Sequence, residues 1–251
     1  MIERTMKARL ATGETLVGAF ANLGSPLAVE AMGVAGLDWV LVDLEHGGGH
    51  EAALVGQLHA AEVSGMHALV RVEAAERARV GRALDLGAEG VMFPRLDTVD
   101  EARGAIRLLR YQPEGDRGVA TYNRACGFGT RPEAIDSAAE RVLGIVQIES
   151  PAAVDAAEEI AQLDGVDVLF IGPGDLSHAM GIRGQLDHAD FRGAVARVVD
   201  AAESAGKAAG ILVGAAAGLP GAIDDGFRMI GVGSDSTLLA QAVGAVMSVA
   251  R

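Results

Sequence analysis

Two carboxylates, Glu149 and Asp175, each follow a short apolar run that is typical of a buried strand. The runs cover residues 142–148 and 168–171, and the segment 151–163 between them has the length of a helix. A strand, a helix and a second strand in this order form a right-handed crossover of parallel strands, so both acids should emerge at one edge of a sheet. Two oxygen ligands, with room left for water and substrate, suit a divalent cation such as Mg²⁺ or Mn²⁺.

Other polar side chains occur at the ends of further predicted strands. The second strand closes with Asp43, Glu45 and His46, the third ends at Arg71, and Gln147 precedes Glu149 by two residues on the fifth. Residues two apart on a strand share a face, so Gln147 and Glu149 should point the same way. Each residue alone has a structural explanation, such as a salt bridge or a helix cap. Together, charged groups at four strand ends inside apolar walls favour one catalytic site.

Eight strand-and-helix units follow one another along the chain. The predicted strands are short and apolar on both faces and alternate mostly with Ala-rich amphipathic segments, which is typical of a parallel sheet covered by helices. They cover residues 15–20, 39–43, 68–72, 90–93, 142–148, 168–171, 208–213 and 229–232. This pattern predicts an α/β fold, a single (β/α)8 TIM barrel over residues 1–251. A doubly wound sheet is the alternative, but it needs a glycine fingerprint after the first strand, which residues 22–26 do not provide.

Composition narrows the function classes. The 251 residues are 50% hydrophobic and carry a formal net charge of -13, which argues against a nucleic-acid partner. The apolar runs are too short to span a membrane, and the first four residues lack the order of a signal peptide. Cys126 is the single cysteine, so an intramolecular disulfide is excluded and a cytoplasmic location is expected.

With these residues identified, the sequence resembles the HpcH/HpaI aldolases, the metal-dependent class II pyruvate aldolases, over nearly its whole length. The resemblance is carried by residues 39–46, 84–88, 110–118, 146–150 and 170–177, of which the last two segments are the most specific.

The resemblance implies a role for each candidate. Glu149 and Asp175 ligate a divalent metal (Mg²⁺, Mn²⁺ or Co²⁺), while Gln147 and the backbone near Gly174 bind pyruvate. Arg71 contacts the substrate and stabilises the transition state. His46 transfers the proton, and Asp85 raises its basicity. Asp43 and Glu45 contact the catalytic and metal-binding side chains rather than the substrate and keep them in position. Members of this family are typically hexamers, trimers of dimers, so Asp85 is expected to reach a neighbouring subunit's site.

The chemistry agrees with this inventory. A 2-oxo acid chelates a cation that acts as a Lewis acid toward its enolate, and His46 exchanges a proton with the 4-hydroxyl group. Lys207 precedes its strand, so no lysine stands where a Schiff base would form. The expected function is cleavage or formation of 4-hydroxy-2-oxo acids from pyruvate and an aldehyde. A related lyase or synthase using the same enolate (decarboxylation or acyl condensation) and a catalytically silent oxo-acid sensor are the alternatives.

Four segments have consequences beyond the site. Arg95 could bind an acidic aldehyde or pair with Asp97 or Glu101, and the ion pair is favoured. The irregular stretch 111–141 fits a lid or an interface loop equally. The glycine-rich loop 47–50 is expected to be flexible. Finally, residues 237–250 are apolar on nearly every side of a helix, which predicts that this helix packs into a neighbouring subunit. The resemblance implies that the last helix is exchanged between subunits; the alternative is that its alanines and glycine simply tolerate exposure.

Overall fold

The computed structural model of the chain describes residues 4–250. Eight parallel strands close into a barrel in the order β1 to β8, with β8 pairing to β1. The strands are β1 (Leu16–Ala21), β2 (Trp39–Asp43), β3 (His67–Arg71), β4 (Gly90–Phe93), β5 (Leu143–Ile148), β6 (Val168–Ile171), β7 (Ala208–Val213) and β8 (Met229–Ser234). The predicted (β/α)8 barrel is therefore confirmed, and each strand lies within two residues of its predicted bounds. Residues 1–3 and 251 of the predicted domain lie outside the described part.

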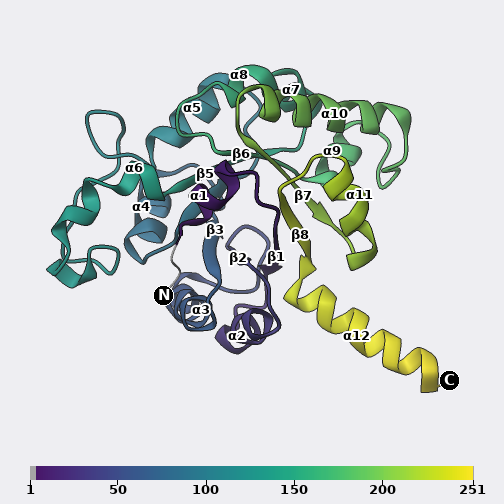
Figure 1. Cartoon of the computed structure of the whole chain (residues 1–251), viewed down its shortest axis with the longest axis horizontal. Coiled ribbons are helices and arrows are strands. Elements are labelled where there is room, and N and C mark those ends of the chain that lie inside the picture. The colour runs from purple at the N-terminus through teal and green to yellow at the C-terminus, as the bar shows by residue number, and fades with distance from the viewer. Residues whose placement is uncertain (1–3, 251) are drawn as a thin grey trace.

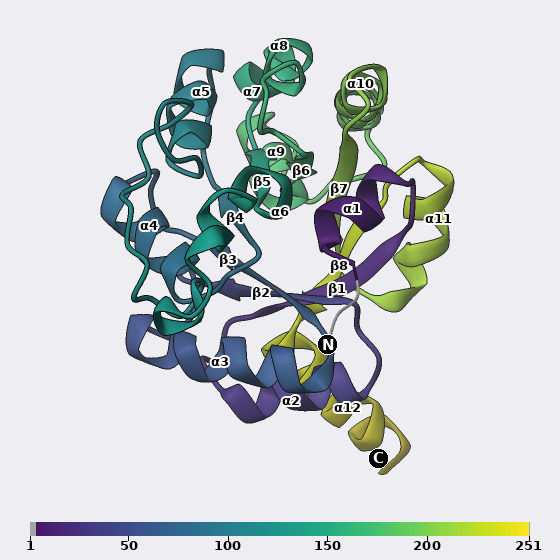
Figure 2. The same cartoon turned by 60° about the vertical axis from the view of Figure 1, so that its left-hand side comes forward.

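Helices surround the barrel (Figures 1 and 2). They are α1 (Met6–Ala11), α2 (Pro26–Val34), α3 (Glu51–Ser64), α4 (Arg77–Asp85), α5 (Val99–Arg107), α6 (Ala138–Arg141), α7 (Pro151–Asp155), α8 (Ala157–Ala161), α9 (Pro173–Ala179), α10 (Ala189–Ser204), α11 (Leu219–Asp224) and α12 (Asp235–Ala250), with 3-10 turns η1 (Gly127–Gly129), η2 (Pro132–Ile135) and η3 (Ala216–Gly218). No helix within residues 4–250 is long and apolar enough to cross a membrane.

Local chemistry explains where the helices next to the site begin. Thr98 and Glu101 form a reciprocal capping box at the start of α5, and Ser150 caps α7 with proline at the first helical position. The helix predicted over residues 151–163 is instead two short helices, α7 and α8, which meet at Ala156. That prediction was wrong because no glycine or proline marks the break and alanine favours continuation.

The barrel interior is filled by large apolar side chains. Trp39 is fully buried, and its indole nitrogen donates a hydrogen bond of 3.2 Å to the carbonyl oxygen of Leu16. A Cβ on Gly18 would lie 2.1 Å from the Trp39 ring, so glycine is required for β1 to approach β2 with this ring between them. The interior is therefore a packed core that closes the barrel below the carboxyl ends of the strands.

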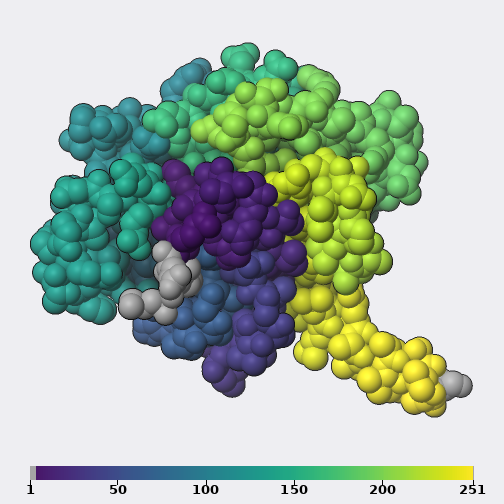
Figure 3. Space-filling model, viewed as in Figure 1, coloured from purple at the N-terminus to yellow at the C-terminus, as the bar shows by residue number. Residues whose placement is uncertain are grey.

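The C-terminal helix α12 leaves the barrel rather than covering it. It projects from the body of the subunit (Figures 1 and 3). Its large apolar side chains are exposed by between 42% and 89%: Leu239, Val243, Val246, Met247 and Val249. Such a continuous exposed apolar surface is typical of a segment that packs against another molecule.

Candidate active site

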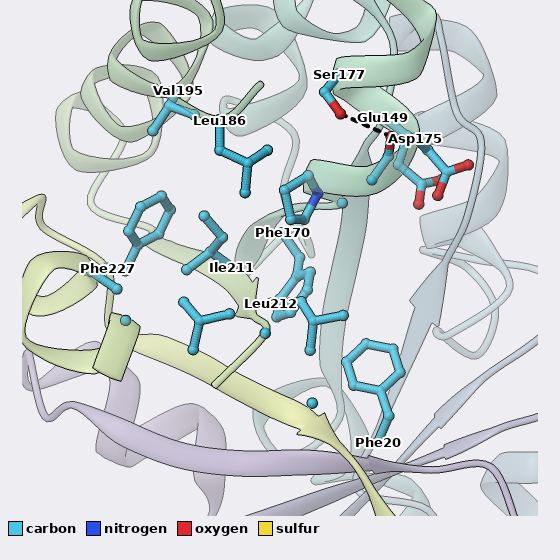
Figure 4. A pocket seen from close by; sticks show the side chains of 18 of the residues that line it. Phe20, Glu149, Phe170, Asp175, Ser177, Leu186, Val195, Ile211, Leu212 and Phe227 are labelled. Carbon is cyan, nitrogen blue, oxygen red and sulfur yellow. Dashed lines mark hydrogen bonds between the residues drawn. The ribbon is translucent and has the colours of Figure 1, made fainter. Parts of the chain in front are cut away.

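A cavity of about 770 Å³ opens at the carboxyl ends of the strands. Seven predicted site residues line it together: Asp43, His46, Arg71, Gln147, Glu149, Gly174 and Asp175. Their convergence follows from topology, because parallel strands of one barrel all end on the same face. Figure 4 shows Glu149 beside Asp175 on one side of this cavity, opposite an apolar part that reaches Phe227.

Asp43 and Arg71 form a buried, two-point ion pair at the ends of β2 and β3. The Nε and Nη2 atoms of Arg71 donate to the two carboxylate oxygens of Asp43 at 2.9 and 2.7 Å. Burial works to lower the pKa of Arg71, but the carboxylates of Asp43, Glu45 and Glu149 outweigh it, and the pKa ends above its usual value. The guanidinium is therefore a fixed positive charge, and it lies 5.2 Å from the ring centre of Phe20.

A chain of hydrogen bonds leads from Arg71 to Glu149. Arg71 Nη1 donates to Gln147 Oε1 at 3.5 Å, and Gln147 Nε2 donates to Glu149 Oε1 at 2.7 Å. The backbone N–H of Arg95 donates to the other oxygen of Glu149 at 3.2 Å. These bonds fix the orientation of the Glu149 carboxylate toward the cavity.

Glu149 carries the clearest electrostatic signature of the site. Burial and the negative charge of Asp175 raise the pKa of Glu149 to about 7. The carboxylate needs close backbone approach, because a Cβ on Gly172 would lie 2.6 Å from Glu149 Oε1. Strong perturbation of a carboxyl group in a cleft is typical of functional sites.

The donor set fits a divalent cation. Glu149 and Asp175 carry carboxylate oxygens, which are the donors that Mg²⁺ and Mn²⁺ prefer, and both residues line the cavity. Among residues 4–250, no three or more His, Cys, Asp or Glu side chains are placed to hold a metal together. The protein would therefore supply two ligands and leave the other positions to water and substrate.

His46 lies at the mouth of the cavity, one residue beyond Glu45. Its imidazole is 69% exposed, and its Nε2 atom is 3.8 Å from Glu45 Oε2. The same Glu45 oxygen lies 3.1 Å from Arg71 Nη1. The backbone of residues 45 and 46 is held by Asp43, because Asp43 Oδ1 accepts the N–H groups of Glu45 and His46 at 3.0 and 3.2 Å. Asp43 therefore fixes both the guanidinium of Arg71 and the turn that carries His46.

Gly174, in the first turn of α9, also lines the cavity. No atom lies within 4 Å of the position that a Cβ on Gly174 would take, so its backbone is open to a ligand. Ser177 holds this turn by donating to the Gly174 carbonyl oxygen at 3.1 Å (Figure 4).

Asp85 is not brought to this cavity within the described chain. It is the last residue of α4, and it accepts a hydrogen bond of 3.0 Å from Arg117 Nη2. The segment 111–141, which was predicted to be irregular, packs here. Arg124 donates to the Leu86 carbonyl oxygen, and the Ala125 N–H donates to that of Asp85. None of its residues lines the cavity, so in this subunit it is not a lid over the site.

Arg95 adopts an unusual backbone conformation at the rim. Its φ is 56°, a left-handed value that non-glycine residues rarely adopt, and its side chain is exposed. The favoured ion pair with Asp97 or Glu101 does not form in the described structure. Asp97 instead accepts a hydrogen bond from Ser150, and Glu101 accepts the capping bonds of α5.

The sequence analysis did not predict several residues at or just beyond the ends of β1 and β8. Among them, Phe20 and Asn22 line the cavity, and Asp235 contacts the loop beside it. The strand-end reasoning that found the other residues would have found Asn22 and Asp235 as well, whereas Phe20 has the sequence appearance of ordinary core.

Comparison with known proteins agrees with this geometry. The family model described as HpcH/HpaI aldolase/citrate lyase matches residues 16–242. The chain is 40% identical over 236 residues to a hydroxypyruvate/pyruvate aldolase of Paraburkholderia phytofirmans (strain DSM 17436 / LMG 22146 / PsJN), covering 92% of this chain and 91% of the relative. It is 37% identical over 229 residues to a 5-keto-4-deoxy-D-glucarate aldolase of Enterobacter sp. (strain 638), covering 91% and 90%.

A solved structure shows the same fold. An HpcH/HpaI aldolase/citrate lyase family protein from Burkholderia cenocepacia J2315 superposes with a TM-score of 0.93 at 40% identity, covering 98% of this chain and 99% of that one. The chain therefore belongs to the HpcH/HpaI aldolase/citrate lyase family and is a carbon–carbon lyase.

Proposed function

We propose that this lyase is a divalent-metal-dependent aldolase that cleaves or forms 4-hydroxy-2-oxo acids through the enolate of pyruvate and an aldehyde. The observation that carries the proposal is the hydrogen-bonded series Asp43–Arg71–Gln147–Glu149, which ends beside Asp175 at an open cavity. The printed names of the aldolase relatives support the same reaction class.

Glu149 and Asp175 are the proposed ligands of the cation, with Mg²⁺, Mn²⁺ and Co²⁺ as candidates. When bound, the cation supplies a Lewis acid at the ketone oxygen of a 2-oxo acid. The lysines support this route over a Schiff base, because neither is near the cavity. Lys207 directly precedes β7, and Lys7 pairs at 3.1 Å with Asp167, which directly precedes β6.

The protein's own groups provide the remaining chemistry. Arg71 places a fixed charge where negative charge develops on the ketone oxygen, in a site whose walls are largely apolar. Gln147 and the open backbone at Gly174 orient the pyruvate portion. Asp43 holds Arg71 at two points, so the guanidinium needs little reorganisation during the reaction.

His46 is the proposed proton-transferring group. During cleavage its imidazole takes the proton of the 4-hydroxyl group, the C3–C4 bond breaks, and the aldehyde leaves. Condensation returns the proton along the same path. Imidazole is the side chain that most often moves protons near neutral pH, and the exposed position of His46 at the cavity mouth allows it to meet the hydroxyl group.

Two assays test the proposal. Exchange of pyruvate methyl protons into deuterated water should require Mn²⁺ or Mg²⁺ and should stop reversibly with EDTA. A screen of aldehydes with product analysis should then identify 4-hydroxy-2-oxo acids. Exchange without aldol products would favour a decarboxylase or an acyl-condensing synthase, and loss of both would favour a binding protein.

We also propose a homo-oligomer in the cytoplasm, a hexamer built as a trimer of dimers. The exposed apolar surface of α12 supports exchange of this helix between subunits, and the position of Asp85 outside its own cavity supports a shared site. Light scattering and activity of a chain truncated after Ser236 test both points. A fully active monomer would refute them.

A further inference from the structure

We infer that Asp235 is a positioning residue for His46, acting through the loop that follows β1. The inference rests on the proposed role of His46 in the aldolase reaction. Asp235 is the first residue of α12, and it touches neither Glu149 nor Asp175 in any hydrogen bond of the described structure.

The first step joins α12 to the loop after β1. Asp235 is 6% exposed, and its Oδ1 atom accepts the backbone N–H groups of Asn22 at 2.9 Å and Leu23 at 3.3 Å. Its Oδ2 atom accepts the same Leu23 N–H at 3.2 Å. A buried carboxylate with several backbone donors is a strong anchor, because charge-assisted hydrogen bonds are about twice as strong as neutral ones.

The second step joins that loop to the loop carrying His46. The Gly48 N–H donates to the Asn22 carbonyl oxygen at 2.7 Å. A Cβ on Gly24 would lie 2.6 Å from the Gly49 Cα, and one on Gly49 would lie 2.9 Å from the Gly24 Cα. The two loops therefore meet backbone to backbone, in a contact that only glycine allows.

The third step ties the same loop to β2. A Cβ on Gly47 would lie 2.1 Å from the Asp43 carbonyl oxygen, and the Asp43 carboxylate holds the His46 N–H. The glycines of the loop 47–50 therefore serve close packing, and the flexibility expected of this loop stays a prediction. His46 stands on a loop that is fixed at both Asp43 and Asn22, and Asn22 and His46 both line the cavity.

This arrangement makes the position of His46 depend on the start of α12. Loss of the Asp235 carboxylate releases two backbone N–H groups, and the β1 loop no longer supports Gly48. Displacement of a reacting group by about 1 Å can cost about 100-fold in rate. The proposed metal ligands should stay in place. Glu149 directly follows β5 and is held by Gln147 and the Arg95 N–H, and Asp175 lies on α9, away from the β1 loop.

Two reactions separate positioning of His46 from general damage. Aldol cleavage needs a base for the 4-hydroxyl proton. Decarboxylation of oxaloacetate breaks its C3–C4 bond to release CO2 and the same enolate, which then takes a proton from solvent, and no hydroxyl proton has to be removed. Asp235→Ala should lower kcat for cleavage by about 10- to 100-fold, where the larger figure corresponds to a shift of His46 by about 1 Å. Decarboxylation and Mn²⁺ affinity should stay near wild type, and Asp235→Asn should recover much of the cleavage rate.

Asp38→Ala is the matched control. Asp38 also accepts a backbone N–H of β1, that of Val17 at 3.0 Å, but at the opposite end of the strand. Asp38→Ala should therefore change the rates of aldol cleavage and oxaloacetate decarboxylation by the same factor. Gly49→Ala provides a second route to the same displacement and should reproduce the selective loss. An equal fall of both reactions in Asp235→Ala, or no change in either, would overturn the inference.

Amide hydrogen exchange gives a readout that does not depend on activity. In Asp235→Ala, the amides of residues 22–23 and 46–48 should exchange faster, while those of β5 should not. If the wild-type protein shows neither reaction, the proposed function fails, but this exchange pattern still decides whether Asp235 holds the loop. Unchanged exchange at residues 46–48 would refute the link.

Discussion

The Asp43–Arg71 pair should contribute far more to stability than a surface pair of the same geometry. The chain contains a matched control in Arg110 and Asp164, whose two hydrogen bonds are 2.9 and 3.1 Å long. Those of Arg71 and Asp43 are 2.9 and 2.7 Å. The difference is the burial of the acid: the Asp43 side chain is 4% exposed and that of Asp164 is 87% exposed, whereas the two arginine side chains are 9% and 16% exposed.

The expected magnitudes follow from this difference. Removing one partner of a buried ion pair costs about 3–5 kcal/mol, because the other charge remains buried without its partner. Glu45 stays 3.1 Å from Arg71 and offsets part of this cost, so Asp43→Asn should lie near the lower end, about 3 kcal/mol. Asp164→Asn should cost between about 0 and 1 kcal/mol, because the Asp164 carboxylate is 87% exposed and water weakens its attraction to Arg110.

Thermal unfolding of both variants, without metal and at one protein concentration, measures the contrast. In a chain of this size about 1 kcal/mol shifts Tm by about 2–4 °C, so Asp43→Asn should lower Tm by about 6–12 °C. Asp164→Asn should lower Tm by less than about 4 °C by the same conversion. Equal shifts in the two variants would refute the view that burial decides the contribution of the pair.

Three further results are expected. Glu149→Ala and Asp175→Ala should lose both activity and Mn²⁺ binding, which calorimetry measures. His46→Ala should keep the metal and lose turnover. Normal turnover with full metal occupancy in Glu149→Ala would contradict the ligand assignment. Arg71→Ala should lower kcat and kcat/KM together, and a rise in KM alone would make Arg71 a simple substrate anchor. Because the pKa of Glu149 is raised to about 7 without metal, protons compete with Mn²⁺ for this carboxylate below about pH 7. The Mn²⁺ affinity should therefore rise with pH and level off above about pH 7. An affinity that does not depend on pH would contradict the assignment of Glu149 as a ligand.

The part of the site that the sequence predicted is the part that topology dictates. Once the chain is an eight-stranded parallel barrel, every strand end lies on one face, and polar residues at those ends must meet. His46, Arg71, Gln147, Glu149 and Asp175 were all found in this way, and all line the cavity.

What the sequence did not predict depends on contacts between distant segments. The break at Ala156 has no local signal, and the φ of 56° at Arg95 arises where its N–H reaches the Glu149 carboxylate. The role of Asp235 needs β8 and β1 to be neighbours, which only barrel closure establishes. The proposed role of Asp85 in catalysis would need a second subunit, because Asp85 does not line the cavity of its own chain.

The distribution of charge around the cavity explains why two carboxylates remain without cationic partners there. Asp43 is satisfied by Arg71, which also faces Glu45 at 3.1 Å. Within the described chain, no lysine or arginine side chain pairs with Glu149 or Asp175. The lack of such a partner is costly for Glu149, whose pKa is raised mainly by burial. An arginine at that point would stabilise the fold, but it would occupy the position that a chelating 2-oxo acid needs. A divalent cation removes the repulsion between the two acids and still offers open coordination positions. In the proposed function, the uncompensated negative charge is therefore concentrated where a cation and its substrate would enter together. Arg71 is linked to Glu149 only through Gln147, and from that position it would meet the charge that develops on the ketone oxygen.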